Sequence, residues 1–576
     1  MHAPYAPGNR AEPLRTVVRR AVEGAWAAAI KQGALPAMDP ADRPPVEVER
    51  PANQDHGDLA TSLALKLARP YRRAPLQIAQ ALATELTGAV DPGGVPLFAT
   101  VAAVSPGFVN VRLSDAVLET VVEGVLATPA TWGRVQAGHP ERIDVEFVSA
   151  NPTGPLHIGN ARGAFMGDLV CRVLEAAGHE TTREYYFNDF GGQVQNLGAS
   201  VRAIRLGRDV PADGYRGDYV HDLARELPVD VALAAEAAAQ AAAGSEGQDA
   251  ADQVVGRWCS ERVRDGIEAS LQRLGVRFDV WKTESSLHDD GWVARAVERL
   301  RETGTVYEAE GATWFRSTQY GDDKDRVIYR SNGRPTYFAA DIGYVTEKFS
   351  RGFDRLIYIW GADHHGTVAR LLNAAQAMGY NRSAVEVLLT AWVRFIRDGQ
   401  DISMSKRTGE FITLDELLSE IGVDAARWFF ASRAPSSGID FDIELAKKQS
   451  SENPVYYVQY AHARIASILR KAADTGLSRA DEIPGGLAGT PEGTLARALA
   501  RLPEVVEDAA AARETQGVTS FATDLATTFH AFYRDARVVD LEDPTRSRAR
   551  LALVDAARIT LANALGLLGI SAPESM

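Results

Sequence analysis

The feature that most constrains the fold is a strand that runs through a Pro/Gly turn into a long helix. Residues 142–150 are rich in β-branched and aromatic side chains, which is typical of a strand, and the next five, Asn-Pro-Thr-Gly-Pro, favour a turn. The helix that follows is predicted to stop at Gly178. Further strands are expected at 181–187 and 355–362, with helical stretches between them. Strands that alternate with helices predict a doubly wound, Rossmann-like parallel sheet.

The length of the chain allows several domains, since a domain usually holds about 100–200 residues and the chain has 576. We expect a small α+β domain over residues 1–122 and an α/β domain over 123–440. An all-α domain should follow over 441–576, where strand patterns give way to long amphipathic helices. An Ala-rich stretch at about 205–255 has little to bury, so we expect an inserted surface helix or a partly mobile lobe, without chemistry.

Composition excludes some classes of function. The net charge of −14 argues against a protein that coats nucleic acid by bulk positive charge, although it does not exclude a local basic groove. Cys171 and Cys259 are far apart and in no CxxC pair, so we expect two buried thiols rather than a disulfide framework or a zinc site. The N-terminus lacks the apolar region of a signal peptide, and no apolar run approaches the roughly 20 residues of a spanning helix. We therefore expect a cytoplasmic protein with no membrane partner.

A first candidate site lies at the turn of the strand–turn–helix unit, at Pro155, Leu156, His157, Gly159 and Asn160. Open parallel sheets bind ligands at the carboxyl ends of their strands, and the N–H groups at a helix N-terminus attract phosphate. A glycine lets a nucleotide approach the backbone closely, and an imidazole can donate a hydrogen bond to a phosphate oxygen. These residues are predicted to bind a nucleotide, although a single histidine at a turn more often has no such role.

A second candidate segment lies far downstream and comprises Ser403, Met404, Ser405, Lys406 and Arg407. A mobile polar loop with a lysine can close onto a triphosphate and neutralise charge as pyrophosphate leaves. On its own, such a loop is more often a solvated surface. Together and in this order, the two segments resemble the HIGH and KMSKS signatures of class I aminoacyl-tRNA synthetases.

Further segments resemble the arginyl-tRNA synthetases of the bacterial type. Residues 145–155 resemble that family's lead-in to HIGH, and residues 453–464 resemble the start of its anticodon-binding domain. Residues 54–61 and 106–110 resemble its additional N-terminal domain, which the family places against the tRNA elbow, and the C-terminal Met576 also fits. The resemblance covers almost the whole chain, apart from the Ala-rich insert.

The sequence departs from the family pattern at three positions. Asn160 stands where HIGH has its last histidine, and Ser403 stands where KMSKS has its first lysine. Gly154 occupies a position before HIGH where family members often carry a lysine. Because one cation can serve the same phosphates from either side, Lys406 can take over that role.

The resemblance implies a fold, an activity and partners. A Rossmann-like catalytic core is expected between a small α+β domain and a helical anticodon-binding bundle. The implied activity is ATP-dependent activation of L-arginine and its transfer to the 3′ end of tRNA(Arg), which gives AMP and pyrophosphate. ATP would arrive with Mg²⁺ as a substrate complex, with no tightly bound cofactor, and we expect a monomer. His157 and Lys406 are the implied catalytic residues, because both would stabilise charge on the phosphates.

A pocket for arginine needs carboxylates placed for bidentate contact, since a guanidinium keeps its charge. The resemblance implies that arginine contacts Glu146, Ser149, Asn151, Gln193, Tyr337 and Asp341. Without the resemblance, Asp341 equally fits a charge at a helix N-terminus or a surface ion pair. Gly361 and Asp363 are implied to border the adenosine. Asp363 and the two histidines after it also fit a metal site, but no third ligand has a suitable spacing, so we expect no metal.

Contacts with tRNA are implied in both flanking domains, at Asp58, Asn110, Tyr456, Tyr533, Arg537 and Met576. Tyr533 and Arg537 lie four residues apart and are predicted to share one helical face. Aromatic and guanidinium planes can stack on unpaired anticodon bases. The alternative is that Tyr533 belongs to the core and Arg537 is a solvated charge.

Two other functions fit part of the pattern. A nucleotidyltransferase that builds dinucleotide cofactors can carry an HxGH motif, but it should be much shorter and lack the helical C-terminal domain. A non-catalytic tRNA-binding paralogue should have lost His157 or Lys406, and the sequence has both.

Overall fold

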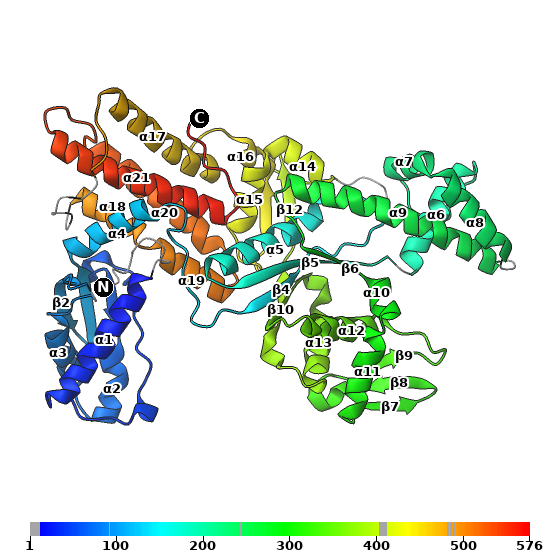
Figure 1. The fold of residues 1–576 in the computed structure, drawn as a ribbon, viewed down its shortest axis with the longest axis horizontal. Coiled ribbons are helices and arrows are strands. Elements are labelled where there is room, and N and C mark those ends of the chain that lie inside the picture. The colour runs from blue at the N-terminus through cyan, green and yellow to red at the C-terminus, as the bar shows by residue number, and fades with distance from the viewer. Residues whose placement is uncertain are drawn as a thin grey trace. The chain divides into compact units, whose positions relative to one another are not determined.

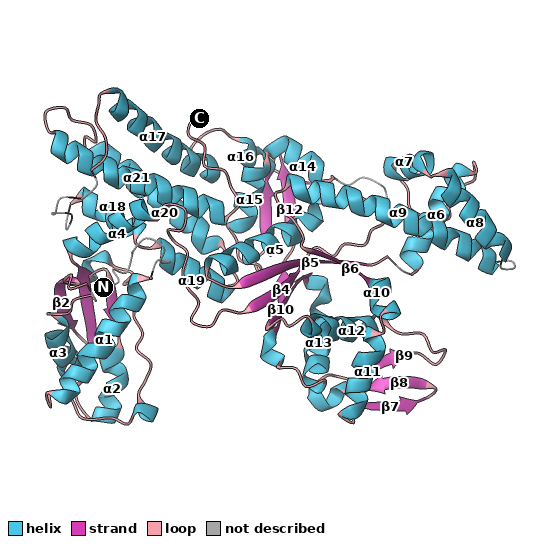
Figure 2. Ribbon diagram, viewed as in Figure 1, coloured by secondary structure: helices cyan, strands magenta, loops and turns pink. Residues whose placement is uncertain are grey.

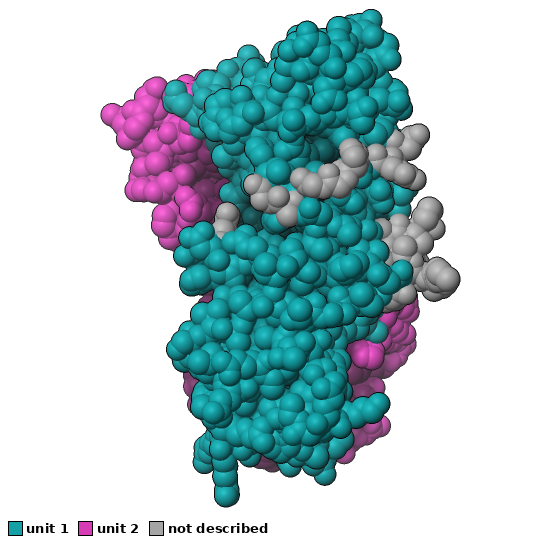
Figure 3. Space-filling model, turned by 90° about the vertical axis from the view of Figure 1, so that its left-hand side faces the viewer, with its two compact units in different colours: residues 1–138, 176–178, 449–576 teal, residues 139–175, 179–448 magenta. Residues whose placement is uncertain are grey.

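A computed structural model describes residues 12–91, 93–189, 191–241, 245–402, 412–480, 483, 487 and 490–576. The chain divides into two compact units, which are described here one at a time (Figure 3). Unit 1 comprises residues 1–138, 176–178 and 449–576, and unit 2 comprises residues 139–175 and 179–448.

Unit 2 is built on a five-stranded sheet in the order β11-β10-β4-β5-β6, and every neighbouring pair is parallel (Figures 1 and 2). The strands are β4 (Arg142–Glu146), β5 (Glu180–Phe187), β6 (Val280–Thr283), β10 (Arg355–Gly361) and β11 (Val385–Thr390). Helix α5 (Ile158–Ala176) covers one face of the sheet, while α12 (Tyr337–Ser350) and α13 (His365–Ala377) cover the other (Figure 1). The predicted α/β core is therefore confirmed.

Strand β4 lies in the middle of the sheet and marks a reversal of its order. The chain adds β5 and β6 on one side of β4, and later adds β10 and β11 on the other. Open α/β sheets bind ligands at such a reversal, outside the carboxyl ends of the strands. Side chains alternate along β4, so Asp144 and Glu146 point to one face and Ile143 and Val145 to the other. The strand thus carries two buried carboxylates, where a central parallel strand usually has apolar residues.

A lobe of four helices separates β5 from β6, and it is larger than the Ala-rich insert expected from the sequence. Its helices are α6 (Gly192–Arg205), α7 (Asp218–Glu226), α8 (Val229–Ala241) and α9 (Ser245–Arg273). Helices α6 and α9 pack with their backbones close together. A Cβ atom at Gly198 would lie 1.9 Å from the Asp252 carbonyl oxygen, and one at Gly256 would lie 2.2 Å from that of Val194.

The rest of unit 2 surrounds the sheet. An apolar core joins α12 and β10 to the segment between β6 and β10. That segment contains α10 (Glu284–Asp289), α11 (Trp292–Glu302) and the antiparallel strands β7 (Val306–Ala309), β8 (Ala312–Phe315) and β9 (Arg326–Tyr329). After β11 come β12 (Val393–Arg397), β13 (Gln400–Asp401), α14 (Leu414–Ile421), α15 (Val423–Ala431), β14 (Ile439–Asp442) and α16 (Ile443–Lys447).

Unit 1 combines the two ends of the chain. Its N-terminal part has a three-stranded antiparallel sheet in the order β1-β3-β2, with helices packed on it. These elements are α1 (Leu14–Lys31), β1 (Leu59–Thr61), α2 (Leu63–Tyr71), α3 (Pro75–Leu86), β2 (Phe98–Val104), β3 (Phe108–Leu113) and α4 (Asp115–Ala127). The C-terminal part is helical, with α17 (Pro454–Asp474), α18 (Pro491–Leu499), α19 (Leu502–Ala512), α20 (Gln516–Asp535) and α21 (Pro544–Leu567). Ion pairs of Arg15 with Glu507 and of Arg50 with Glu504 join the two parts.

Both cysteines are buried and free, as predicted, and burial raises the pKa of each thiol. Across the described residues, no helix is both long and apolar enough to span a membrane.

Candidate active site

The turn after β4 has an unusual backbone. Val148 and Ser149 have φ angles of 68° and 39°, a left-handed conformation that is costly for residues with a Cβ, and most of all for a β-branched one. The Ser149 hydroxyl donates to Glu146 Oε1 at 3.1 Å and accepts from the Tyr186 N–H at 3.1 Å. Strain of this kind concentrates at functional sites, and here it brings Ser149 back over Glu146 and leaves Asn151 exposed.

The start of α5 is arranged to receive an anion. His157 immediately precedes the helix, which begins at Ile158, and the His157 N–H donates to Asn160 Oδ1 at 3.3 Å. A Cβ atom at Gly159 would lie 2.8 Å from Cε1 and Nδ1 of His157, so only glycine lets the imidazole lie against the helix start. Pro155 is half-buried and Leu156 is buried. Backbone N–H groups and an imidazole therefore meet where the sequence predicted nucleotide binding.

The chain returns to His157 just after the segment that resembles KMSKS. The Ile158 N–H donates to the Ile412 carbonyl at 3.1 Å, and the Leu414 N–H donates to the Leu156 carbonyl at 3.0 Å. This pairing places residues 412–414 directly beside the start of α5. The predicted nucleotide contacts Met404, Ser405 and Lys406 lie outside the described residues.

The end of β10 lies next to β4 in the sheet. A Cβ atom at Gly361 would lie 2.4 Å from Asp363 Oδ1, so this glycine makes room for the Asp363 carboxylate. Asp363 and His364 are exposed, and they lie 3.7 Å apart. In the part of the chain that the structure describes, no group of three His, Cys, Asp or Glu side chains could hold a metal ion.

One face of α12 carries the next two predicted contacts. Tyr337 and Asp341 are one turn apart, and Tyr337 is 73% exposed. The pKa of Asp341 is raised to about 7, first by burial and then by the charges of Glu146 and Glu284. The predicted carboxylate pair, Glu146 and Asp341, is therefore brought within electrostatic range. Asp341 is half-buried, and among the described residues it forms no ion pair, so the alternative of a surface ion pair has no support.

Glu284 is a third carboxylate at this site, and the sequence analysis missed it. It begins α10 directly after β6 and is 7% exposed. Its pKa is raised, first by burial and also by Asp189, while a hydrogen bond with Tyr186 opposes the shift. The short strand β6 was not predicted, so nothing placed Glu284 at the carboxyl edge of the sheet.

The loop after β5 is tied to α10. Asp189 accepts hydrogen bonds from the N–H and the hydroxyl of Ser285, at 2.9 Å and 2.6 Å. Gln193 lies in the first turn of α6, after this loop, and is exposed.

A buried ionic network lies beneath Glu146. Lys348 Nζ is 2.8 Å from Glu146 Oε2 and 2.8 Å from Asp144 Oδ2, and all three side chains are 0–6% exposed. Arg351 is 2.6 Å from Glu184 on the next strand. Burial raises the pKa of Asp144 to about 7, although the charge of Lys348 opposes the shift.

The inserted lobe touches the turn before α5. The Tyr219 hydroxyl of α7 donates to the Thr153 carbonyl at 2.9 Å. A Cβ atom at Gly154 would lie 3.3 Å from the same phenol, so a longer side chain there would have to displace Tyr219. The insert, for which we expected no chemistry, thus supports the loop that carries Asn151.

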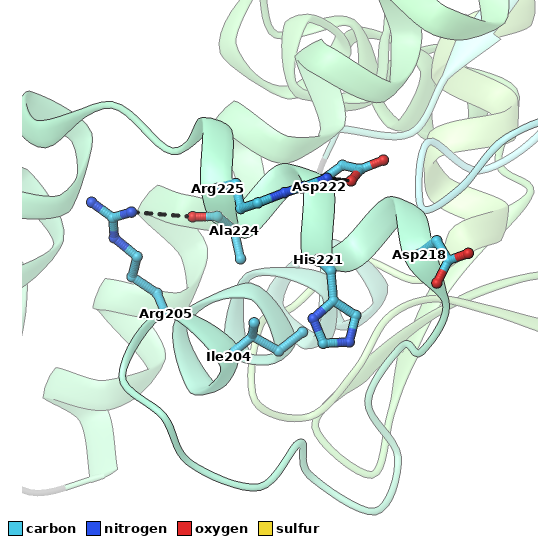
Figure 4. A pocket seen from close by; sticks show the side chains of 7 residues that line it. All are labelled: Ile204, Arg205, Asp218, His221, Asp222, Ala224 and Arg225. Atoms are coloured by element: carbon cyan, nitrogen blue, oxygen red, sulfur yellow. Dashed lines mark hydrogen bonds and ion pairs between the residues drawn. The ribbon is translucent and has the colours of Figure 1, made fainter.

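A cavity of about 780 Å³ lies elsewhere in unit 2, between α6 and α7 (Figure 4). Its lining residues are Ile204, Arg205, Asp218, His221, Asp222, Ala224 and Arg225. Three of its charged side chains already have partners, since Arg225 pairs with Asp222 and Arg205 donates to the Ala224 carbonyl at 3.4 Å. None of the predicted site residues lines this cavity, so we do not place the active site there.

In unit 1, the predicted tRNA contact Asp58 is bonded to other residues of the protein. Its carboxylate accepts from the Leu113 N–H at 2.8 Å and lies 3.0 Å from Arg497, and the side chain is 10% exposed. These bonds leave it little freedom to meet a tRNA. Asn110 lies in β3 and is half-buried.

Aromatic and cationic side chains gather on α17 and α20. Tyr456 and Tyr460 stack with ring centroids 6.5 Å apart. The Arg464 guanidinium lies over the Tyr460 and Tyr533 rings, 5.3 Å and 5.0 Å from their centroids. Tyr533 is 38% exposed, so it does not belong to the core. We call Tyr456, Tyr460, Arg464 and Tyr533 the aromatic patch.

Arg537 does not share a helical face with Tyr533, contrary to the prediction. Helix α20 ends at Asp535, because Ala536 adopts an extended conformation. Arg537 is an exposed charge 3.6 Å from Asp540. Met576 is 52% exposed at the C-terminus.

Family models match three successive parts of the chain. Residues 16–113 match "Arginyl tRNA synthetase N terminal domain", residues 121–435 match "tRNA synthetases class I (R), catalytic domain", and residues 458–576 match "DALR anticodon binding domain".

Curated relatives and solved structures agree with these matches. The chain is 43% identical to an arginine–tRNA ligase of Citrifermentans bemidjiense, over 98% of this chain and all of that protein. It is 40% identical to the arginine–tRNA ligase of Bacillus subtilis, over 99% of this chain and all of that protein. Its structure resembles the arginyl-tRNA synthetase of Thermus thermophilus with a TM-score of 0.74 and 25% identity, covering 97% of this chain and all of that one.

Proposed function

The chain belongs to the class I arginyl-tRNA synthetases, which ligate arginine to tRNA with ATP, and we propose that the turn after β4, the start of α5 and one face of α12 form its active site. The observation that carries this proposal is the hydrogen bonding of residues 412–414, which follow the segment resembling KMSKS in the chain, to the start of α5 beside His157. Domain boundaries at about residues 122 and 440 belong to the same proposal.

Arginine would be held by carboxylates that share one region of unit 2. The charges of Glu146 and Glu284 both act on Asp341, so a cation that enters beside Asp341 relieves this repulsion. A planar guanidinium can meet two carboxylates at once, whereas a lysine ammonium cannot match both with the same geometry. Tyr337 would cover the pocket from its exposed position on α12.

The α-amino and α-carboxylate groups of arginine would lie nearer the turn after β4. Asn151 and Ser149 offer polar atoms there, and Gln193 offers another from the start of α6. The strained backbone at Ser149 fixes this turn before substrate arrives, which lowers the entropy cost of orienting the substrate.

ATP would lie with its phosphates at the start of α5. Its phosphates would face the N–H groups at residues 158–160 and the imidazole of His157, beside the backbone of Pro155 and Leu156. The ribose would lie near Gly361 and Asp363, across the reversal in strand order. Mg²⁺ would come with ATP, held by phosphate oxygens rather than by a cluster of protein ligands, and would neutralise phosphate charge.

The two chemical steps need no covalent enzyme intermediate. An arginine carboxylate oxygen attacks the α-phosphorus of ATP in line, which forms arginyl-adenylate and releases pyrophosphate. His157 and Lys406 stabilise the charge that grows on the phosphate oxygens. A hydroxyl of the terminal adenosine of tRNA then attacks the adenylate carbonyl, loses its proton, and releases AMP.

The tRNA contacts are proposed at the aromatic patch, with Asn110 and Met576 as further contacts. Three tyrosines and an arginine on one surface suit the stacking of unpaired bases. Asp58 is better explained as a structural carboxylate, and Arg537 as an exposed charge that does not lie on α20. We further propose that the enzyme acts as a monomer in the cytoplasm.

The test is exchange of labelled pyrophosphate into ATP by the purified chain, with each amino acid in turn and with or without tRNA. We expect exchange with arginine alone among the amino acids, followed by charging of tRNA. Absence of both reactions would leave a non-catalytic tRNA-binding protein as the better explanation. A shorter dinucleotide-forming nucleotidyltransferase is already excluded by the matches along the whole chain.

A further inference from the structure

One face of α12 links the proposed substrate contacts to a buried lysine. Tyr337, Asp341, Tyr344 and Lys348 follow one another at intervals of four, three and four residues, so they share a face of the helix. Exposure falls along this face, from 73% at Tyr337 to 0% at Lys348. The face therefore runs from the mouth of the proposed arginine pocket to the layer beneath it.

Lys348 lies among three carboxylates of two neighbouring strands. Its Nζ is 2.8 Å from Asp144 Oδ2, 2.8 Å from Glu146 Oε2 and 3.9 Å from Glu184 Oε1. Burial alone would lower the pKa of Lys348, but the carboxylates outweigh burial and raise the pKa well above its usual value. The carboxylates therefore favour the charged form of this lysine.

Two tyrosine rings complete the surroundings of this ammonium group. Nζ lies 4.3 Å from the ring centroid of Tyr344 and 4.2 Å from that of Tyr358. Contacts of a cation with the faces of aromatic rings are attractive. The two rings and the carboxylates of the sheet together hold the ammonium group in one position. A lysine side chain has several rotatable bonds, so holding it in one conformation costs entropy that these contacts must offset.

Glu146 is the member of the cluster that also belongs to the proposed substrate pocket. Lys348 contacts its Oε2, and the Ser149 hydroxyl donates to its Oε1 at 3.1 Å. Each carboxylate oxygen can accept more than one hydrogen bond, so both retain a place for a donor of the substrate. The other titratable groups that act on Glu146 are Tyr186 of β5, Asp341 and Tyr344 of α12, and Tyr358 of β10. None of these four is a cation, and Lys348 supplies the positive charge in contact with Glu146.

We propose that Lys348 is a positioning residue for arginine, which holds the Glu146 carboxylate in a fixed orientation before the substrate arrives. The inference rests on the proposed function, because it requires Glu146 to contact arginine. Without the lysine, Asp144, Glu146 and Glu184 would repel one another in a buried layer. The cluster would then bind a proton or turn Glu146 aside, and either change removes an acceptor from the arginine pocket. Preorganisation of the acceptor also lowers the cost of ordering it on binding.

The first experiment compares wild type with Lys348→Met and with Lys348→Met/Asp144→Asn. The single substitution leaves buried carboxylates without their cation, so it is expected to weaken the fold as well as substrate binding. The double variant removes one negative charge together with the positive one, so it keeps the net charge of the cluster and should fold. In both variants we expect KM for arginine to rise about tenfold to a hundredfold, while kcat falls by less than about threefold.

Arg427→Met is the matched control. Arg427 is 1% exposed and its guanidinium lies 2.8 Å from the buried Asp168, so the substitution also removes a buried cation from a carboxylate of unit 2. Asp168 belongs to α5 rather than to the arginine pocket. We expect Arg427→Met to lower the denaturation midpoint and to leave KM for arginine within about twofold of wild type.

Two results would overturn the inference. One is a wild-type KM for arginine in the double variant, because Lys348 would then serve only to neutralise Asp144. The other is an equal rise in KM in Arg427→Met, because the effect would then be a general result of losing a buried cation. Failure of the proposed function would look different, since the wild-type protein itself would not activate arginine.

Discussion

Asp341→Asn should make the enzyme more stable and nearly unable to bind arginine. The substitution keeps the size of the side chain and removes its charge. In the wild-type protein, the half-buried Asp341 carboxyl group has a pKa raised to about 7 from 3.8, first by desolvation and then by the charges of Glu146 and Glu284, while the charge of Arg370 opposes the shift. The folded protein therefore binds the Asp341 proton more tightly than the unfolded chain does between these two pH values. Its contribution to stability is greatest below about pH 4 and is lost progressively as the pH rises towards 7.

The size of this effect follows from the two pKa values. Each tenfold difference in proton affinity is worth about 1.4 kcal/mol, so the ionised carboxylate costs the folded state up to about 4 kcal/mol at pH 8. Between pH 5 and pH 8 the wild-type protein should lose about 2.5 kcal/mol from this group alone, while the Asn variant should lose none of it. Arginine should restore about 2.7 kcal/mol to the wild type at a hundred times its Kd.

The assay is urea unfolding of unit 2 at pH 5, 6, 7 and 8, with and without arginine, together with KM for arginine in pyrophosphate exchange. Loss of a charge-assisted contact to the guanidinium should raise KM about a hundredfold or more. Asp58→Asn is a control that makes the same chemical change with the opposite expected effect on stability. The Asp58 carboxylate is paired with Arg497, so the loss of its charge should destabilise unit 1. Parallel loss of stability with pH in wild type and Asp341→Asn would refute the reasoning.

Three further outcomes are expected. Lys406→Ala and His157→Ala should each lower the rate of single-turnover adenylate formation about a hundredfold to a thousandfold, with little change in arginine affinity. An unchanged rate would remove that residue from the mechanism. Tyr219→Phe removes the hydrogen bond to the turn before α5, so KM for arginine should rise a few fold. The free energy of unfolding of unit 2 should fall by about 1 kcal/mol. An unaltered KM would limit Tyr219 to a structural role. Pyrophosphate exchange should require tRNA, and exchange without tRNA would contradict this expectation. Tyr533→Ala should reduce the discrimination against a tRNA with an altered anticodon, and unchanged discrimination would contradict the role of Tyr533.

The sequence was sufficient for the parts of the fold that local rules govern. The strand, Pro/Gly turn and helix around His157 each carry their own signal, and the alternation of elements then implies a parallel sheet. Glu146 and Asp341 were predicted to act together from a family motif and from the charge of a guanidinium. The reversal of strand order at β4 then explains why residues so far apart in the chain meet at one edge of the sheet.

Other features depend on tertiary contacts that no local pattern encodes. Arg537 was placed on a helix because the pattern continues past Asp535, but the helix stops there without a glycine or proline to mark its end. Asp58 looks like a surface carboxylate until Arg497 is brought to it from the other end of the chain. Glu284 follows a strand of only four residues, which is too short for periodicity to identify.

Lys348 is the most instructive of these, because a lysine in a helix is usually read as solvated charge. Its burial becomes reasonable only when the charges of unit 2 are considered together. Lys348 and Arg351 form ion pairs with carboxylates of β4 and β5. In the described part of the chain, no lysine or arginine lies within ion-pair distance of Asp341 or Glu284, although the charge of Arg370 acts on Asp341.

Of the carboxylates without an ion pair, Asp341 lies on α12 between the exposed Tyr337 and the buried Lys348, and Glu284 begins α10. Burying Asp341 and Glu284 is unfavourable for the free enzyme, as the raised pKa of each shows. A substrate with a permanent positive charge at the end of a flexible chain removes that penalty, and a neutral amino acid does not. Lys348 neutralises the charge of Asp144 and Glu146, so Asp341 and Glu284 remain available to the substrate. Selectivity for arginine would then depend on both sets of carboxylates, and it should weaken when either set is changed.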